Sequence, residues 1–176
     1  GSELEAISEE DIPLTEAVSK VTAHQLEQAI LLERMLRYGG VKKENAQKHF
    51  EETVTKFEKL AHRVDKEILT AEELAEHGST HAHSQEMAVK FESVLKKLKK
   101  IETEHTTFDE HVFQVADLIR NGQMDEAGVL AEKIELEEEQ LDHELIALLE
   151  DLEAFTAEAA RRATEHEKSA IVQLSL

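Results

Sequence analysis

The sequence predicts an all-α fold, namely an antiparallel up-down-up-down four-helix bundle. Glycine and proline are scarce, at 6 and 1 among 176 residues. Ala, Leu, Glu, Lys and Gln are abundant, and these residues lose little conformational freedom in a helix. Apolar residues recur with the 3.6-residue period of a helix, and no stretch alternates with period two, so no sheet is expected.

Turn signals divide the chain into four helices within one domain, residues 3–176. Gly1-Ser2 resembles a cloning scar and is left out of the domain. Pro13 suits the first turn of a helix, and the runs Gly39-Gly40, 77–80 and Asn121-Gly122 mark the three breaks that follow. Short connections between long amphipathic helices make neighbours antiparallel. The predicted helices cover residues 13–38, 41–76, 83–120 and 125–174.

Each predicted helix carries one apolar stripe at helical spacing, which we expect to face the core. The stripe of helix 83–120 is the most regular and includes a histidine: Phe91, Val94, Leu98, Ile101, His105, Phe108, Val112, Val115 and Ile119. In helix 125–174 it comprises Ala127, Leu130, Ile134, Leu141, Leu145, Leu148, Leu152 and Phe155. In helix 41–76 it comprises Phe50, Val54, Phe57, Ala61, Val64 and Ile68. In helix 13–38 it comprises Leu14, Val18, Val21, Leu32 and Met35, with Gln25 and Gln28 on the same face.

Helix 13–38 carries a second, weaker apolar stripe on its other side, formed by Ala23, Leu26 and Ile30. A four-helix protomer needs only one stripe per helix, so the extra one predicts a partner helix. The simplest partner is the same helix of a second chain, which gives a homodimer. The alternative is a scatter of surface apolar residues, which is common in soluble proteins.

Composition excludes several function classes. The chain has 39 acidic and 20 basic residues, a formal net charge of −19, which disfavours binding to nucleic acid or anionic lipid. It contains no cysteine, so disulfides, c-type haem attachment and thiolate zinc sites are excluded. No Ser-His-Asp arrangement, glycine-rich phosphate loop or phosphate-binding lysine motif is present. The chain is therefore not expected to be an enzyme.

Four polar residues are predicted to lie at nearly the same height in the core: His24, His105, Glu137 and Glu138. The height follows from counting residues back from the turns at a rise of about 1.5 Å each. A buried carboxylate costs several kcal/mol unless it is paired or bound to a metal. Three interpretations remain open. The residues form a hydrogen-bonded polar layer, they bind one transition metal ion such as zinc or iron, or, least favoured, His24 and His105 ligate a haem b.

The first predicted helix resembles a known receptor family. The segments 11–18 (Asp-Ile-Pro-Leu-Thr-Glu-Ala-Val), 24–30 (His-Gln-Leu-Glu-Gln-Ala-Ile) and Glu33-Arg34 resemble methyl-accepting chemotaxis proteins, directly after their first transmembrane helix. The resemblance implies a periplasmic four-helix bundle of an inner-membrane protein. It also implies a small-anion site at the membrane-distal dimer interface, for which Arg34 and Arg37, with the nearby Gln25 and Gln28, are the candidates.

The expected function is thus an extracytoplasmic sensor domain of a transmembrane chemoreceptor. It would detect a small molecule or a metal ion and pass a helix displacement across the membrane to cytoplasmic signalling partners. The rise in apolarity over residues 170–176 is interpreted as the approach to a membrane segment. The alternative is a stand-alone metal-binding bundle of the di-iron or ferritin-like kind. That alternative is less well supported, because only Glu102 and His105 have the Glu-x-x-His spacing of such centres.

Overall fold

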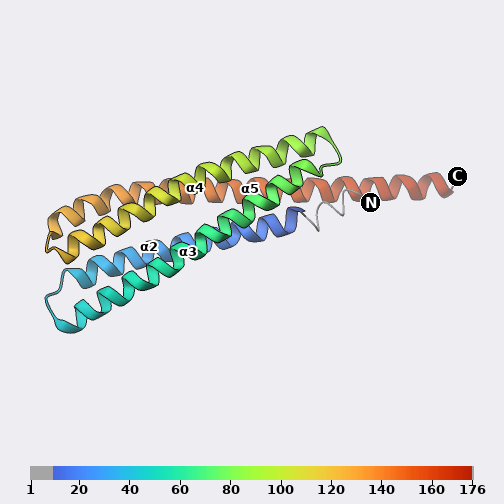
Figure 1. Cartoon of the computed structure of the whole chain (residues 1–176). Coiled ribbons are helices and arrows are strands. Elements are labelled where there is room, and N and C mark those ends of the chain that lie inside the picture. The colour runs from blue at the N-terminus through green and yellow to red at the C-terminus, as the bar shows by residue number, and fades with distance from the viewer. Residues whose placement is uncertain (1–9, 176) are drawn as a thin grey trace.

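A computed structural model describes residues 10–175 and confirms an all-α four-helix bundle (Figure 1). The helices are α2 (Ile12–Gly39), α3 (Glu44–Thr80), α4 (Gln85–Arg120) and α5 (Met124–Ser175). No strand occurs among residues 10–175. The predicted helix boundaries agree with these to within about four residues, as expected when turn signals are strong.

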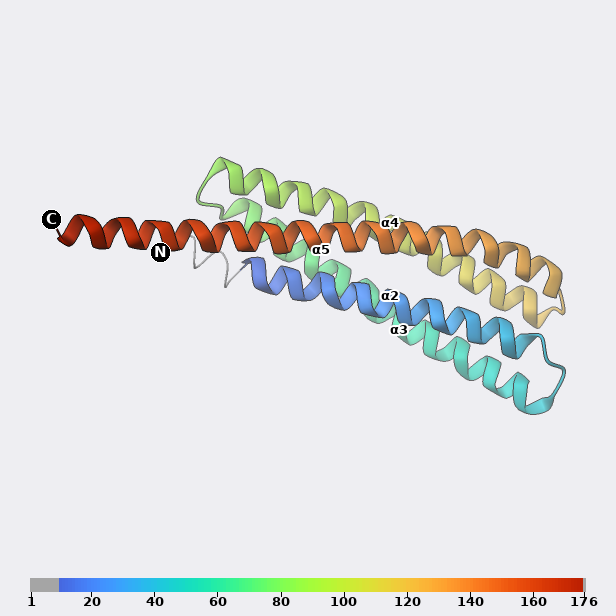
Figure 2. The same cartoon turned by 180° about the vertical axis from the view of Figure 1, so that it is seen from behind.

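Consecutive helices run in opposite directions, as the colour gradient in Figures 1 and 2 shows. Side-chain contacts also show that neighbouring helices are antiparallel, because residues nearer the end of one helix contact residues nearer the start of the next. The pairs are His24–Glu67 and Tyr38–His49 between α2 and α3, Glu51–Arg120 and Asp65–His105 between α3 and α4, and Lys97–Asp151 and His111–Glu137 between α4 and α5. Since α2 also packs against α5, each helix contacts two neighbours around the core.

The core is formed by the predicted stripes. Every predicted stripe residue of α2, α3 and α4 is buried, including Gln25, Gln28 and His105. In α5 the stripe is buried except at Leu130 and Phe155, which are partly buried and pack on the core. Helical periodicity alone therefore identified the inward faces, because a helix buries one continuous stripe against its neighbours.

The predicted end of the second helix is wrong. Helix α3 does not end at Glu76 but continues through Gly78 to Thr80. Gly78 lies against the ring of Phe91, and a Cβ atom at this position would lie 2.6 Å from the ring. The glycine therefore permits close packing of α3 on α4, whereas Ser84 provides the actual start of α4 by accepting a hydrogen bond from the Met87 amide at 3.2 Å.

Helix α5 projects well beyond the other three helices (Figure 2). Its last buried residue is Ala163, and its side chains are exposed from Thr164 to Leu174. Exposed apolar residues in this stretch include Ile171 and Leu174. Among the described residues, no helix has the length and apolarity needed to cross a membrane.

The second stripe of the first helix lies outside the core, as expected. Leu26 and Ile30 on α2 are 46% and 49% exposed, and Ala23 is also exposed. Homodimerisation through this stripe stays a prediction.

Candidate metal centre

His105 lies in the middle of α4 with only 1% of its surface exposed. Its Nε2 atom lies 2.8 Å from Oε1 of Gln28 on α2. Its Nδ1 atom lies 3.1 Å from Oδ1 of Asp65 on α3 and 3.4 Å from Oδ2 of Asp109, one turn further along α4. Three helices thus contribute polar groups to one imidazole ring in the core.

Gln28 fixes which ring nitrogen of His105 carries a proton. The fully buried amide donates from Nε2 to Oδ1 of Asp109 at 2.9 Å, so its Oε1 is the atom that faces His105. An amide oxygen can only accept, and His105 must therefore donate from Nε2. In the neutral ring, Nδ1 is then an acceptor.

Three acceptor atoms consequently face one another: Nδ1 of neutral His105 and one carboxylate oxygen each from Asp65 and Asp109. A proton or a cation has to lie between them for the cluster to be stable. Burial lowers the pKa of His105, although the nearby Asp65 carboxylate acts in the opposite direction. Burial raises the pKa of Asp109 to about 7, against the hydrogen bond from Gln28, and Asp65 and Glu110 add to the rise. The cluster therefore exchanges a proton near neutral pH.

The same three atoms can hold a metal ion. They lie within 4.8 Å of one another, and they form the one such group among residues 10–175. Two ligands about 2.0–2.2 Å from a tetrahedral zinc ion are separated by roughly 3.4 Å. The Nδ1 separations of 3.1 and 3.4 Å from Asp65 and Asp109 match this value. The Asp65 side chain is half exposed, so the group is open to solvent on the α3 side.

The structure does not bring the four predicted metal ligands together. His24 contacts Glu67 at 2.6 Å across the α2–α3 interface, whereas Glu137 contacts His111 at 2.6 Å across the α4–α5 interface. These interfaces lie on opposite sides of the bundle, so neither residue shares a site with His105. The prediction erred because counting from the turns gives height along the bundle, while the direction around it depends on helix phase.

Glu138 is also outside the cluster. It is partly buried on α5, and burial raises its pKa to about 7, with the carboxylates of Asp142 and Glu33 adding to the rise. Glu33 belongs to α2, so Glu138 faces the α5–α2 side of the bundle. The surrounding carboxylates and the burial both favour the protonated form of Glu138.

The four candidate ligand-binding residues of the first helix have separate environments. Gln28 is part of the His105 cluster. Gln25 is buried, and its amide nitrogen has no hydrogen-bond partner among residues 10–175. Arg34 is exposed and lines a groove between α2 and α3, while the guanidinium of Arg37 lies 5.3 Å from the ring of Tyr38. Arg37 does not line that groove, and an anion site that uses both arginines stays a prediction.

Sequence reasoning missed the two aspartates of the cluster. Asp109 could have been found, because it follows His105 by four residues and such residues are neighbours on a helix. Asp65 gives no such signal, since it lies on the polar flank of α3 beside the core residue Val64.

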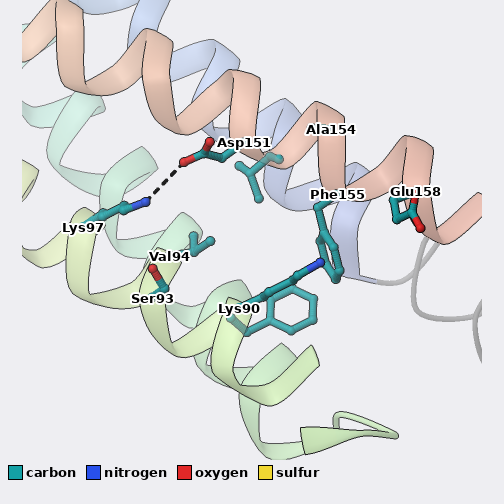
Figure 3. A pocket seen from close by; sticks show the side chains of 10 residues that line it. Lys90, Ser93, Val94, Lys97, Asp151, Ala154, Phe155 and Glu158 are labelled. Carbon is teal, nitrogen blue, oxygen red and sulfur yellow. Dashed lines mark hydrogen bonds and ion pairs between the residues drawn. The ribbon is translucent and has the colours of Figure 1, made fainter. Parts of the chain in front are cut away.

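A separate apolar cavity of about 330 Å³ lies between α4 and α5 (Figure 3). Both lysines at its edge have partners. Lys97 pairs with Asp151 at 3.2 Å, and the ammonium of Lys90 lies 4.4 Å from the centre of the Phe155 ring. Both lysines of this cavity have partners within the protein, so their charges give no reason to expect a bound ligand.

No protein-family model matches the sequence, no curated protein matches it, and no solved structure matches the chain.

Proposed function

We propose that this chain is the sensor domain of a transmembrane receptor, and that it detects a divalent transition metal ion held by Asp65, His105 and Asp109. The observation that carries the proposal is the inward-facing acceptor cluster. The buried Nδ1 atom of His105 lies 3.1 Å from a carboxylate oxygen of Asp65 and 3.4 Å from one of Asp109, and all three atoms lie within 4.8 Å of one another.

The surroundings of His105 support a metal more than a polar layer alone. Histidines that bind metals usually donate their second ring nitrogen to a nearby oxygen, which fixes the ring and its tautomer. Gln28 accepts that hydrogen bond and also orients Asp109, so one side chain positions two ligands. The net charge of −19 further concentrates cations at the surface. Imidazole with two carboxylates suits zinc or ferrous iron.

Binding would change how the helices pack. The ligands belong to α3 and α4, so a cation between them removes the repulsion between Asp65 and Asp109 and draws the two helices together. Because α5 packs on both α4 and α2, it would respond as a rigid element. The receptor assignment is supported by the continuation of α5 beyond the bundle and by the resemblance of residues 11–34 to chemotaxis receptors.

A stand-alone metal-binding bundle is the second candidate, favoured by the interior position of the cluster. Ferritin-like centres take carboxylates from four helices and hold two metal ions. The cluster instead offers three ligands from two helices, which suits one ion. We therefore place the sensor first.

The test is metal binding by the purified domain. Metal should be removed by dialysis against a chelator, and Zn²⁺ or anaerobic Fe²⁺ then added while thermal unfolding is followed. A metal present at 100 times its Kd should stabilise the fold by about 2.7 kcal/mol. Asp65→Asn should abolish this gain without disturbing the core, because Asp65 is half exposed.

Asp151→Asn is the matched control, since Asp151 is an exposed aspartate that pairs with Lys97 far from the cluster. It should leave the metal response unchanged. If neither metal raises the melting temperature of the wild-type domain, the cluster is a hydrogen-bonded polar layer and the proposal is wrong.

A further inference from the structure

A groove of about 550 Å³ runs along the α2–α3 interface. On each helix, the lining residues lie three, four and seven positions after the first one, so they share one face of that helix. Ile30 and Leu31 of α2 and Leu60 of α3 form its apolar floor. Arg34 of α2 and Lys56, Lys59 and Arg63 of α3 form its edges, while Glu27 is its one acidic lining residue.

The charge of this groove is opposite to that of the protein. The whole chain has about two acidic residues for each basic one, whereas the groove has four basic residues and one acidic residue. Lys97, which lines the α4–α5 cavity, is paired with Asp151. By contrast, Arg34, Lys56 and Lys59 make no ion pair with any residue in the range 10–175, and Arg63 has one long contact of 3.7 Å with Glu67.

The antiparallel register spreads these cations along the groove. His24 lies opposite Glu67 and Tyr38 lies beside His49, so Arg34 is level with Lys56, and Glu27 is level with Arg63. An occupant therefore meets two cations at the end nearer the 40–43 loop and a further one, Lys59, beside the apolar floor. Apolar surface together with convergent cations is the arrangement that binds a compact apolar body carrying an acidic group.

We propose that this groove binds a small organic anion, a carboxylate attached to a compact apolar body. The carboxylate would lie between Arg34 and Lys56, with Lys59 in reach, and the apolar body would cover Leu31 and Leu60. The proposal is independent of the metal centre, because none of the groove residues belongs to the His105 cluster.

Benzoate is a suitable probe, and the methyl groups of Ile30, Leu31 and Leu60 report on the groove directly by nuclear magnetic resonance. Benzoate should shift these three resonances in a saturable way and leave those of Val129 and Leu136 unchanged. Val129 and Leu136 are exposed apolar residues of α5 and control for general adsorption. Benzyl alcohol, which has a similar ring and no charge, should bind at least about fivefold more weakly.

Variants that replace basic residues by glutamine separate the effect of the groove cations from the effect of the overall net charge. Arg34→Gln with Lys59→Gln should weaken benzoate binding by about fivefold or more. Lys96→Gln with Lys133→Gln makes the same change in net charge at exposed sites outside the groove, and should leave the affinity within about twofold. Asp65→Asn should also leave it unchanged, so loss of metal binding and loss of anion binding are distinguishable.

Three results would overturn the proposal. Benzoate fails to shift the groove methyls at its highest soluble concentration, or it shifts the α5 methyls equally. Alternatively, the Leu31 and Leu60 resonances, which lie outside the exposed α2 stripe, depend on protein concentration without benzoate, which would mean that a second copy of the chain covers the groove.

Discussion

Gln28 on α2 and His105 on α4 face each other across the core and are joined by a hydrogen bond of 2.8 Å between Oε1 and Nε2. This bond leaves the other ring nitrogen of His105 directed at Asp65 and Asp109. The relationship links the first helix of the bundle to the candidate metal ligands without making Gln28 a ligand itself.

Replacing Gln28 by leucine should therefore affect both folding and metal binding. The substitution leaves His105 and Asp109 without their buried partner, which should lower the free energy of unfolding by about 1–3 kcal/mol. It should also weaken metal affinity by about 10–100-fold, because the ring and the carboxylate lose their orientation. Urea unfolding and calorimetric titration with Zn²⁺ measure the two effects.

Gln25→Leu is the matched control. Gln25 is equally buried on the same helix face, yet its amide nitrogen makes no hydrogen bond with residues 10–175. This substitution should be close to neutral or stabilising, and it should leave Zn²⁺ affinity unchanged. Equal losses in both variants would show that Gln28 has no special role.

Stability should fall as pH rises from about 4 to 8. The folded state raises the pKa of Asp109 to about 7, and does the same for Glu72, Glu104 and Glu138, mainly through burial. These four carboxyl groups thus bind more protons in folded than in unfolded protein between the ordinary carboxyl pKa and 7, whereas the lowered pKa values of Glu144 and His105 act in the opposite direction. The contribution of the four groups to stability is greatest below the ordinary value and is lost as they ionise. Urea unfolding over this pH range gives the slope.

Asp109→Asn should flatten that dependence in part, because it removes one of the groups with a raised pKa. Zn²⁺ should have the opposite effect in the wild-type domain and stabilise it more at pH 8 than at pH 5, since the ion competes with a proton. A stability that rises steadily with pH in the absence of metal would contradict the assignment.

Gly78 and Gly128 should respond oppositely to alanine. A Cβ at Gly78 would lie 2.6 Å from the Phe91 ring, so Gly78→Ala should destabilise by about 1–3 kcal/mol. Gly128 lies within α5 with nothing within 4 Å of an added Cβ, so Gly128→Ala should stabilise by up to about 1 kcal/mol. Thermal unfolding distinguishes the signs, and a tolerated Gly78→Ala would mean that α3 and α4 pack less closely than described.

The exposed stripe of α2 predicts weak self-association. Sedimentation should detect a monomer–dimer equilibrium, and Leu26→Glu should shift it towards monomer by placing a charge in an apolar contact. Val89→Glu, at a similarly exposed position on α4, should have no effect. A monomer at every concentration would remove the support for a contact through α2.

The fold was predictable because its determinants are local and periodic. The α4 stripe from Phe91 to Ile119 repeats every three or four residues, and each member is buried. The exception is Gly78, where the sequence predicts a helix end and the glycine instead allows close helix packing. Sequence alone does not distinguish the two, because the difference depends on a ring that comes from another helix.

The site was only half predictable for a related reason. The inward positions of His105 and Gln28 followed from their places in the stripes, but their partners depended on helix rotation and register. Asp65 has an exposed side chain and joins the cluster only because α3 and α4 meet at that height. His24 and Glu137 satisfied the estimate of height, yet each pairs across a different interface.

The end of α5 has a consequence for how the domain would be observed in solution. The stretch from Thr164 to Leu174 is roughly 16 Å of helix with exposed side chains. A helix of this length gains little from its own backbone hydrogen bonds in water, so its persistence depends on the buried turns before it and on whatever lies against it. Its amide protons should exchange with solvent far faster than those around Leu148. The amide exchange rate of this stretch therefore reports whether it is in contact with another molecule. Exchange should be slow where a protein neighbour or a membrane covers the helix, and fast where only solvent surrounds it.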